Sequence, residues 1–178
     1  MKIINTKIKG LKVINTERFI DSRGEFRELL RKNISGAKKE FKFTCYSKSK
    51  KNVLRGLHLQ VSHSQAKYIT VVKGAILDVA VDLRKNSKTY KKHYKIILSS
   101  KNCKSIFIPE GFAHGFLSLE KENIIVYHLT EYRSKKDEVG IKWNEEKLRI
   151  NWGIKKPILS LKDANENMSI FDYEKKYN

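Results

Sequence analysis

The stretch that decides the fold class reads Tyr68-Ile-Thr-Val-Val-Lys-Gly-Ala-Ile-Leu-Asp-Val-Ala-Val-Asp-Leu83. Its first five residues are rich in β-branched side chains, and Lys73-Gly74 is a turn signal. From Ala75 onward the residues alternate as in a strand, which places two sets on opposite faces. One set is Leu77, Val79, Val81 and Leu83, and the other is Ile76, Asp78, Ala80 and Asp82. The pattern predicts two strands, interpreted as a hairpin.

Similar short apolar stretches continue along the chain and are separated by turn residues. They are Tyr94–Leu98, Ser105–Ile108, Gly115–Leu119 and Asn123–Leu129. Many short strands at this spacing favour an all-β sandwich or barrel over alternating β and α units. Short helices are expected within 29–41 and 144–148, and the end from Leu159 is expected to pack back on the body. The 178 residues suit one domain, spanning 1–178.

Composition narrows the class of protein further. Hydrophobic residues make up 40% and charged residues 32%, no apolar run approaches the length of a membrane span, and the N-terminus lacks signal-peptide features. We therefore expect a cytoplasmic protein with no membrane partner. The net charge of +19 is mostly lysine spread along the chain, which argues against a nucleic-acid interface. Cys45 and Cys103 are expected to be reduced structural thiols.

Four residues could carry acid–base chemistry. His58 lies in Arg55-Gly-Leu-His-Leu-Gln60, where Gly56 permits a bend or a close backbone approach. His114 follows the Pro109-Glu-Gly111 turn, and Lys67 and Tyr127 lie on apolar strands. Each also has a purely structural interpretation, because a buried histidine or tyrosine needs only a hydrogen-bond partner. Together they would provide a base, a cation and an acid, which suits proton removal next to a carbonyl group.

A metal site is the competing interpretation. Pro109-Glu-Gly-Phe-Ala-His114 is similar to the second metal-binding motif of cupins. The first motif needs His-x-His and a nearby Glu, whereas His58 is followed by Leu59 and Gln60. His58, Gln60 and His114 would make at most an incomplete site, so we expect no metal and no other cofactor.

The chain resembles the dTDP-4-dehydrorhamnose 3,5-epimerase family from about Phe19 to Asp163. The motifs that carry the resemblance are Phe19–Gly24, Ser47–His58, Gln65–Lys67, Asp78–Arg84, Ile108–Phe116, Gly140–Asn144 and Leu159–Asp163. The resemblance implies a metal-free, cupin-type jelly-roll barrel that works as a homodimer on a nucleotide sugar of bacterial surface polysaccharides.

The resemblance also implies roles for individual residues. His58 matches the catalytic base, Asp163 the carboxylate that orients it, Tyr127 the acid on the opposite face of the sugar, and Lys67 the cation beside the enolate oxygen. The matching substrate-contacting positions are Arg23, Glu28, Arg55, His114, Glu138 and Lys162, and Tyr132 matches an aromatic that stacks on the nucleobase.

Three departures from the family pattern leave the substrate open. Phe43-Thr-Cys-Tyr-Ser47 stands where many members have Gln-Asp-Asn-His-Ser, Arg23-Gly-Glu-Phe26 where they have Arg-Gly-Phe-Phe, and Tyr132-Arg133 where they have an aromatic pair. We expect epimerisation at C3, C5 or both of a 4-keto-6-deoxy sugar, either a dTDP-linked hexose or a GDP-linked heptose. A 3,4-ketoisomerase and a non-catalytic nucleotide-sugar or nucleic-acid binding module are the alternatives.

Overall fold

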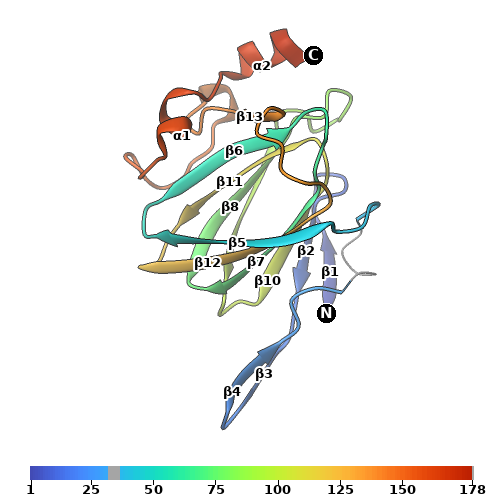
Figure 1. The fold of residues 1–178 in the computed structure, drawn as a ribbon, viewed down its shortest axis with the longest axis vertical. Coiled ribbons are helices and arrows are strands. Elements are labelled where there is room, and N and C mark those ends of the chain that lie inside the picture. Colours follow the sequence, from blue (N-terminus) through green and yellow to red (C-terminus); the bar gives the residue numbers. More distant parts are fainter. Residues whose placement is uncertain (32–36, 178) are drawn as a thin grey trace.

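The computed structural model describes residues 1–31 and 37–177, which form two packed β-sheets, a separate hairpin and a short helical C-terminal segment (Figure 1). The six-stranded sheet has the order β1-β2-β10-β7-β12-β5, and the five-stranded sheet has the order β13-β6-β11-β8-β9. Neighbouring strands in both sheets are antiparallel. This jelly-roll arrangement confirms the all-β prediction. The described residues contain no helix long and apolar enough to cross a membrane.

Both sheets are built from short strands. The six-stranded sheet contains β1 (Lys2–Asn5), β2 (Lys12–Asn15), β10 (Lys104–Ile108), β7 (Lys67–Lys73), β12 (Glu122–Leu129) and β5 (Phe43–Lys50). The five-stranded sheet contains β13 (Glu138–Gly140), β6 (Leu54–Gln60), β11 (Phe112–Ser118), β8 (Ala75–Asp82) and β9 (His93–Ser99). The remaining elements are β3 (Arg18–Asp21), β4 (Gly24–Arg27), the 3-10 helix η1 (Glu146–Leu148), α1 (Leu161–Asn165) and α2 (Ile170–Tyr177).

The predicted strands are all present, but the expected hairpin between β7 and β8 is wrong. β7 pairs with β10 and β12, whereas β8 pairs with β11 and β9, so the two strands belong to different sheets. Gly74 makes the transition with φ +78°, and a Cβ there would lie 2.3 Å from the carbonyl oxygen of Glu122. A turn signal shows that the chain changes direction, but not whether the two strands pair.

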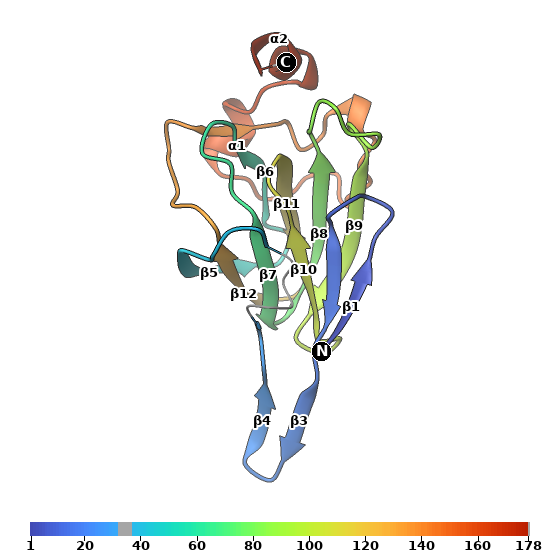
Figure 2. The same ribbon diagram turned by 90° about the vertical axis from the view of Figure 1, so that its right-hand side faces the viewer.

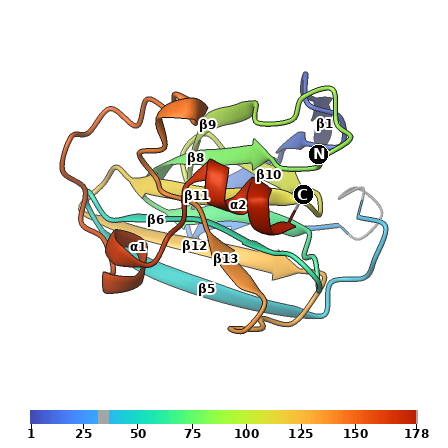
Figure 3. The same ribbon diagram turned by 90° about the horizontal axis from the view of Figure 1, so that it is seen from above.

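The alternation along β8 is confirmed, and both of its faces are buried. Ile76 and Ala80 face the core between the two sheets. Val79 and Val81 belong to a second core on the outer face of the five-stranded sheet, which the C-terminal segment covers (Figure 3). Ile170 and Tyr173 are buried there, as expected for an end that packs back, while Phe171 is exposed.

The helical predictions had mixed outcomes. The turn expected within 144–148 is the 3-10 helix Glu146–Leu148. For the expected helix within 29–41, residues 29–31 and 37–41 are not helical, and residues 32–36 lie outside the described residues. The sequence interpretation missed α1, although Ser160 followed by Asp163 is a capping signal that could have indicated it.

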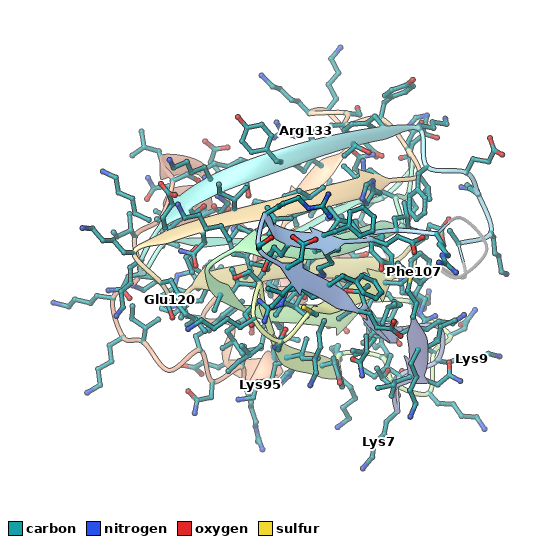
Figure 4. All side chains as sticks on the ribbon, turned by 90° about the horizontal axis from the view of Figure 1, so that it is seen from below. Lys7, Lys9, Lys95, Phe107, Glu120 and Arg133 are labelled. Carbon is teal, nitrogen blue, oxygen red and sulfur yellow. The ribbon has the colours of Figure 1, made fainter. Side chains whose placement is uncertain are left out.

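The hairpin of β3 and β4 projects away from the body (Figures 1 and 2). It exposes three apolar residues to solvent: Phe19 is 59% accessible, Ile20 66% and Phe26 68%. Elsewhere, basic side chains point outward around the periphery; Figure 4 labels Lys7, Lys9 and Lys95 among them. The positive charge is therefore distributed over the surface.

Candidate active site

One pocket of about 360 Å³ collects side chains from both sheets and from the C-terminal segment. Eight of the eleven sequence-predicted site residues line it, each from an element that brings it there. They are Arg55 and His58 of β6, Lys67 of β7, His114 of β11, Tyr127 of β12, Glu138 of β13, and Lys162 and Asp163 of α1.

Two glycines let the histidine-bearing strands approach closely. Gly56 has φ +110°, and a Cβ there would lie 2.6 Å from the Cα of Gly115. A register shift between His114 and Phe116 follows in the pairing of β6 with β11. His58 and His114 are paired across this contact, and both reach the pocket. The expectation of a close approach at Gly56 is confirmed.

His58 and Asp163 form a hydrogen-bonded pair with 2.6 Å between Nε2 and Oδ1. Asp163 is buried, and the hydroxyl of Ser160 donates to its Oδ2 at 3.0 Å. Burial acts to raise the pKa of Asp163, but the hydrogen bond and charge of His58, together with hydrogen bonds from Ser160 and Asn167, hold that pKa below its usual range. An ionised carboxylate only accepts, so Nε2 carries a proton, and in the neutral ring Nδ1 then has the lone pair that a base needs.

Lys67 reaches the same pocket and donates to the backbone oxygen of His58 at 3.4 Å. Burial lowers its pKa to about 8, although the negative charges of Glu138 and Asp78 act in the opposite direction. Near neutral pH the side chain is therefore mostly a cation. A partly desolvated ammonium group is a strong partner for developing negative charge.

Tyr127 forms a 2.9 Å hydrogen bond between its hydroxyl and Oγ of Ser47 on β5. Burial raises the pKa of Tyr127 well above its ordinary value, and the bond to Ser47 only partly opposes this. The phenol therefore stays protonated at any ordinary working pH and can act as a proton donor.

Two further acidic groups organise the basic residues of the pocket. Asp78, fully buried on β8, bonds through Oδ2 to Nε2 of His114 at 2.8 Å. Glu138 accepts from Arg133 at 2.9 and 3.1 Å and from Lys162 at 2.6 Å. Burial acts to raise the pKa of Glu138, but these hydrogen bonds dominate and lower it to about 2. Glu138 is thus a permanent anion between two cations.

The other three predicted residues lie outside this pocket. Arg23 is at the tip of the β3–β4 hairpin and pairs with Asp21. Glu28 follows β4 and pairs with Arg31. The ring of Tyr132 is stacked on Phe43 with centroids 5.6 Å apart, and the residue is 62% accessible.

The sequence interpretation also missed several residues of the site. Arg133 and Cys45 line the pocket, and the sequence interpretation noted both within departures from the family pattern, without giving either a role in the site. Cys45 was expected to be structural but is exposed. Ser160 could have been found as the capping residue of the helix that carries Asp163.

The three residues of the incomplete cupin set all have hydrogen-bond partners within the protein. In the described part of the chain, no cluster of three or more His, Cys, Asp or Glu side chains could hold a metal ion. The amide of Gln60, the third member of the incomplete cupin set, bonds to the backbone of His63, Tyr132 and Ser134.

Comparison with known proteins gives a consistent result. The family model described as dTDP-4-dehydrorhamnose 3,5-epimerase matches residues 5–169. The chain is 41% identical over 170 residues to the dTDP-4-dehydrorhamnose 3,5-epimerase of Shigella flexneri, covering 93% of this chain and 94% of the relative.

Two solved structures are similarly close. A dTDP-4-dehydrorhamnose 3,5-epimerase from Elizabethkingia anophelis superposes with a TM-score of 0.88 at 37% identity, covering 100% of this chain and 99% of the other. The dTDP-6-deoxy-D-glucose-3,5-epimerase of Legionella pneumophila, solved with dTDP-4-keto-L-rhamnose, has a TM-score of 0.88 at 38% identity, covering 92% and 89%.

Proposed function

Because the chain belongs to the dTDP-4-dehydrorhamnose 3,5-epimerase family, we propose that the pocket around His58 is its active site. The protein is an isomerase of nucleotide-sugar biosynthesis that epimerises C3, C5 or both of a nucleotide-linked 4-keto-6-deoxy sugar. The observation that carries the assignment of the site is the meeting of the His58–Asp163 pair with Lys67 and Tyr127 in one cavity.

His58 acts as the base in this proposal. The C4 ketone acidifies the hydrogens on C3 and C5, and Nδ1 of His58 removes one of them as a proton. The electron pair of the broken C–H bond forms the enolate, whose charge settles on the C4 oxygen. Asp163 stabilises the imidazolium that results, as the carboxylate does in a Ser-His-Asp triad.

Lys67 and Tyr127 complete the cycle. The ammonium group of Lys67 donates a hydrogen bond to the enolate oxygen, and the Tyr127 hydroxyl delivers its proton to the carbon from the opposite face, which inverts the centre. Solvent then reprotonates Tyr127 and removes the proton from His58. General acid–base help of this kind contributes about 10²–10⁴-fold per group.

The test follows deuterium from D₂O into a dTDP-linked 4-keto-6-deoxy sugar by NMR. His58→Asn should abolish incorporation at both carbons, because the amide of Asn cannot take up the proton. Tyr127→Phe should retain exchange at the attacked carbon but lose inversion, since abstraction does not need the hydroxyl. His93→Asn, on β9 outside the pocket, is the matched control and should behave as wild type. Exchange by His58→Asn at a rate close to that of wild type would show that His58 is not the base.

For the substrate, we propose a dTDP-linked hexose, because the relatives named above are dTDP-sugar epimerases. A GDP-linked 6-deoxy-4-keto heptose is the second candidate, favoured by the departure at Phe43–Ser47 from the family's nucleotide-holding sequence. Exchange assays with both substrates in parallel separate the two. A product with a shifted carbonyl would indicate a 3,4-ketoisomerase.

We also propose that residues 1–178 act as a single domain that forms a homodimer. The β3–β4 hairpin exposes Phe19, Ile20 and Phe26, an apolar surface that packing on a second copy would remove from water. If each hairpin packs on the partner copy, Arg23, and Glu28 behind it, can serve the partner's pocket. Mixed dimers of Arg23→Ala and His58→Asn chains should then recover activity that neither parent has. If Arg23 served its own pocket, mixing would restore nothing.

The cytoplasm is the proposed compartment. Cys45 and Cys103 are both free thiols, as a reducing compartment keeps them. Immunoblotting of fractionated cells tests this, and recovery in a secreted fraction would contradict it.

A further inference from the structure

Arg133 lies at the mouth of the pocket and has no role in the mechanism above. It lines the cavity, and 57% of its side chain is accessible, so it reaches both the cavity and solvent. Figure 4 labels it beside β5, the strand that carries Cys45. Its charge also acts on the Cys45 thiol, where it lowers the pKa against the larger raising effect of burial.

The guanidinium group of Arg133 is held in a fixed plane. Its Nε and one terminal nitrogen donate to the two oxygens of Glu138, at 2.9 and 3.1 Å. Such a fork of two parallel bonds fixes the orientation as well as the position of the group. Glu138 is itself bonded to Lys162 and, with a pKa of about 2, remains ionised. Arg133 therefore presents a plane of set orientation at the mouth.

The neighbouring aromatic residue does not offer a comparable surface inside the pocket. The ring of Tyr132 is stacked on Phe43, with the ammonium group of Lys42 5.6 Å from its centroid. It is absent from the lining of the cavity, whereas Arg133 is part of it. Of these two neighbouring flat groups, the guanidinium of Arg133 is the one that lines the cavity.

We propose that Arg133 is a specificity-determining residue that stacks its guanidinium plane on the nucleobase of the nucleoside diphosphate. Guanidinium planes stack well on aromatic rings and bases. Glu138 already takes the donors along one edge of Arg133 and balances its charge, so the group is better suited to face a ring than to bind phosphate. This inference rests on the proposed function, because it assumes that the pocket holds a nucleotide sugar.

Three variants separate the plane from the charge. Arg133→Ala removes both, Arg133→Lys keeps only the charge, and Arg133→Tyr keeps only the plane. Base stacking contributes an amount that corresponds to about 5- to 150-fold in affinity. We expect Arg133→Ala and Arg133→Lys to raise KM and the Kd for free dTDP by such a factor with little change in kcat. Arg133→Tyr should stay close to wild type.

Inorganic pyrophosphate, which has no base, is the second probe. Its affinity should be unchanged in all three variants, measured by calorimetry, and Arg149→Lys outside the pocket serves as the matched control. Wild-type dTDP affinity in Arg133→Lys would overturn the stacking role. An equal loss of dTDP and pyrophosphate affinity would do the same, because it would show a phosphate contact. Failure of the proposed function looks different: wild-type protein would bind dTDP through Arg133 yet exchange no deuterium.

Discussion

Replacing Asp163 by Asn tests the centre of the proposed mechanism with almost no change of shape. The carboxylate accepts the Nε2 hydrogen of His58 at 2.6 Å and lies in a buried position. An amide of the same size keeps the packing but cannot stabilise the imidazolium formed when His58 takes a proton. It can also turn its NH₂ group toward Nε2, which would force the ring into the wrong tautomer.

The size of the effect can be derived from the contact that is lost. A hydrogen bond to a charged group is worth about 1.5–3 kcal/mol. If that energy is available only after His58 becomes charged, the rate of proton abstraction falls by roughly 10- to 150-fold. Population of the wrong tautomer would add to the loss, since the corresponding change in a Ser-His-Asp triad costs about 10⁴-fold.

The assay is the initial rate of deuterium incorporation at C3 and C5, measured by NMR near neutral pH in saturating substrate. Ser160→Ala is the informative companion, because it removes the hydroxyl that bonds to Oδ2 of Asp163 but leaves the charge. Its loss should be smaller, within about tenfold for one neutral hydrogen bond of roughly 1 kcal/mol. Exchange by Asp163→Asn at a rate close to that of wild type would refute the orienting and charge-stabilising role.

Individual residues in and around the pocket give three other predictions. Burial lowers the pKa of Lys67 to about 8, so the exchange rate should fall as the pH rises through about 8. In Lys67→Arg the side chain stays charged, so the fall in rate should move to higher pH. Iodoacetamide should alkylate the exposed Cys45 but not the buried Cys103. The rate should rise with pH as the thiolate forms, and at higher pH than for a free thiol, because partial burial raises the pKa of Cys45. dTDP should slow the reaction, and a rate insensitive to dTDP would place the nucleotide elsewhere. Gly56→Ala should lower the free energy of unfolding, measured by denaturant titration, by about 1–3 kcal/mol, because the added Cβ would lie 2.6 Å from the backbone of β11. Gly24→Ala is the control and should lower it by less, because a Cβ there would meet no atom within 4 Å.

The strands were predictable because alternation is a local property of the sequence. The set containing Val79 and Val81 and the set containing Ile76 and Ala80 lie on opposite faces of β8, as predicted. Pairing was not predictable in the same way. The chain crosses to the other sheet at Gly74, where an added Cβ would meet Glu122 and Asn123, residues far along the chain that a local pattern does not include.

The same distinction between local patterns and long-range contacts applies to the site. Single-residue patterns left His58 ambiguous, and the resemblance to a family identified Asp163, 105 residues away, as its partner. Arg133 was noted only as a departure from the family's aromatic pair, because no spacing rule predicts its two hydrogen bonds to Glu138. The role of Tyr132 at the nucleobase comes from the family resemblance and stays a prediction; the structure shows its ring stacked on Phe43.

The position of Asp163, the carboxylate proposed to orient His58, depends on a core that lies outside the pocket. Asp163 lies on α1, a helix of five residues that is too short to hold its place alone. Residues C-terminal to α1 anchor it: the side-chain amide of Asn167 donates to the backbone oxygen of Gly56, and Ile170 and Tyr173 are buried on the outer face of the five-stranded sheet. His58 reaches the pocket from that same sheet, so packing on its outer face sets the distance between base and carboxylate. A cavity made at Ile170 should therefore slow proton abstraction more than it weakens nucleotide binding.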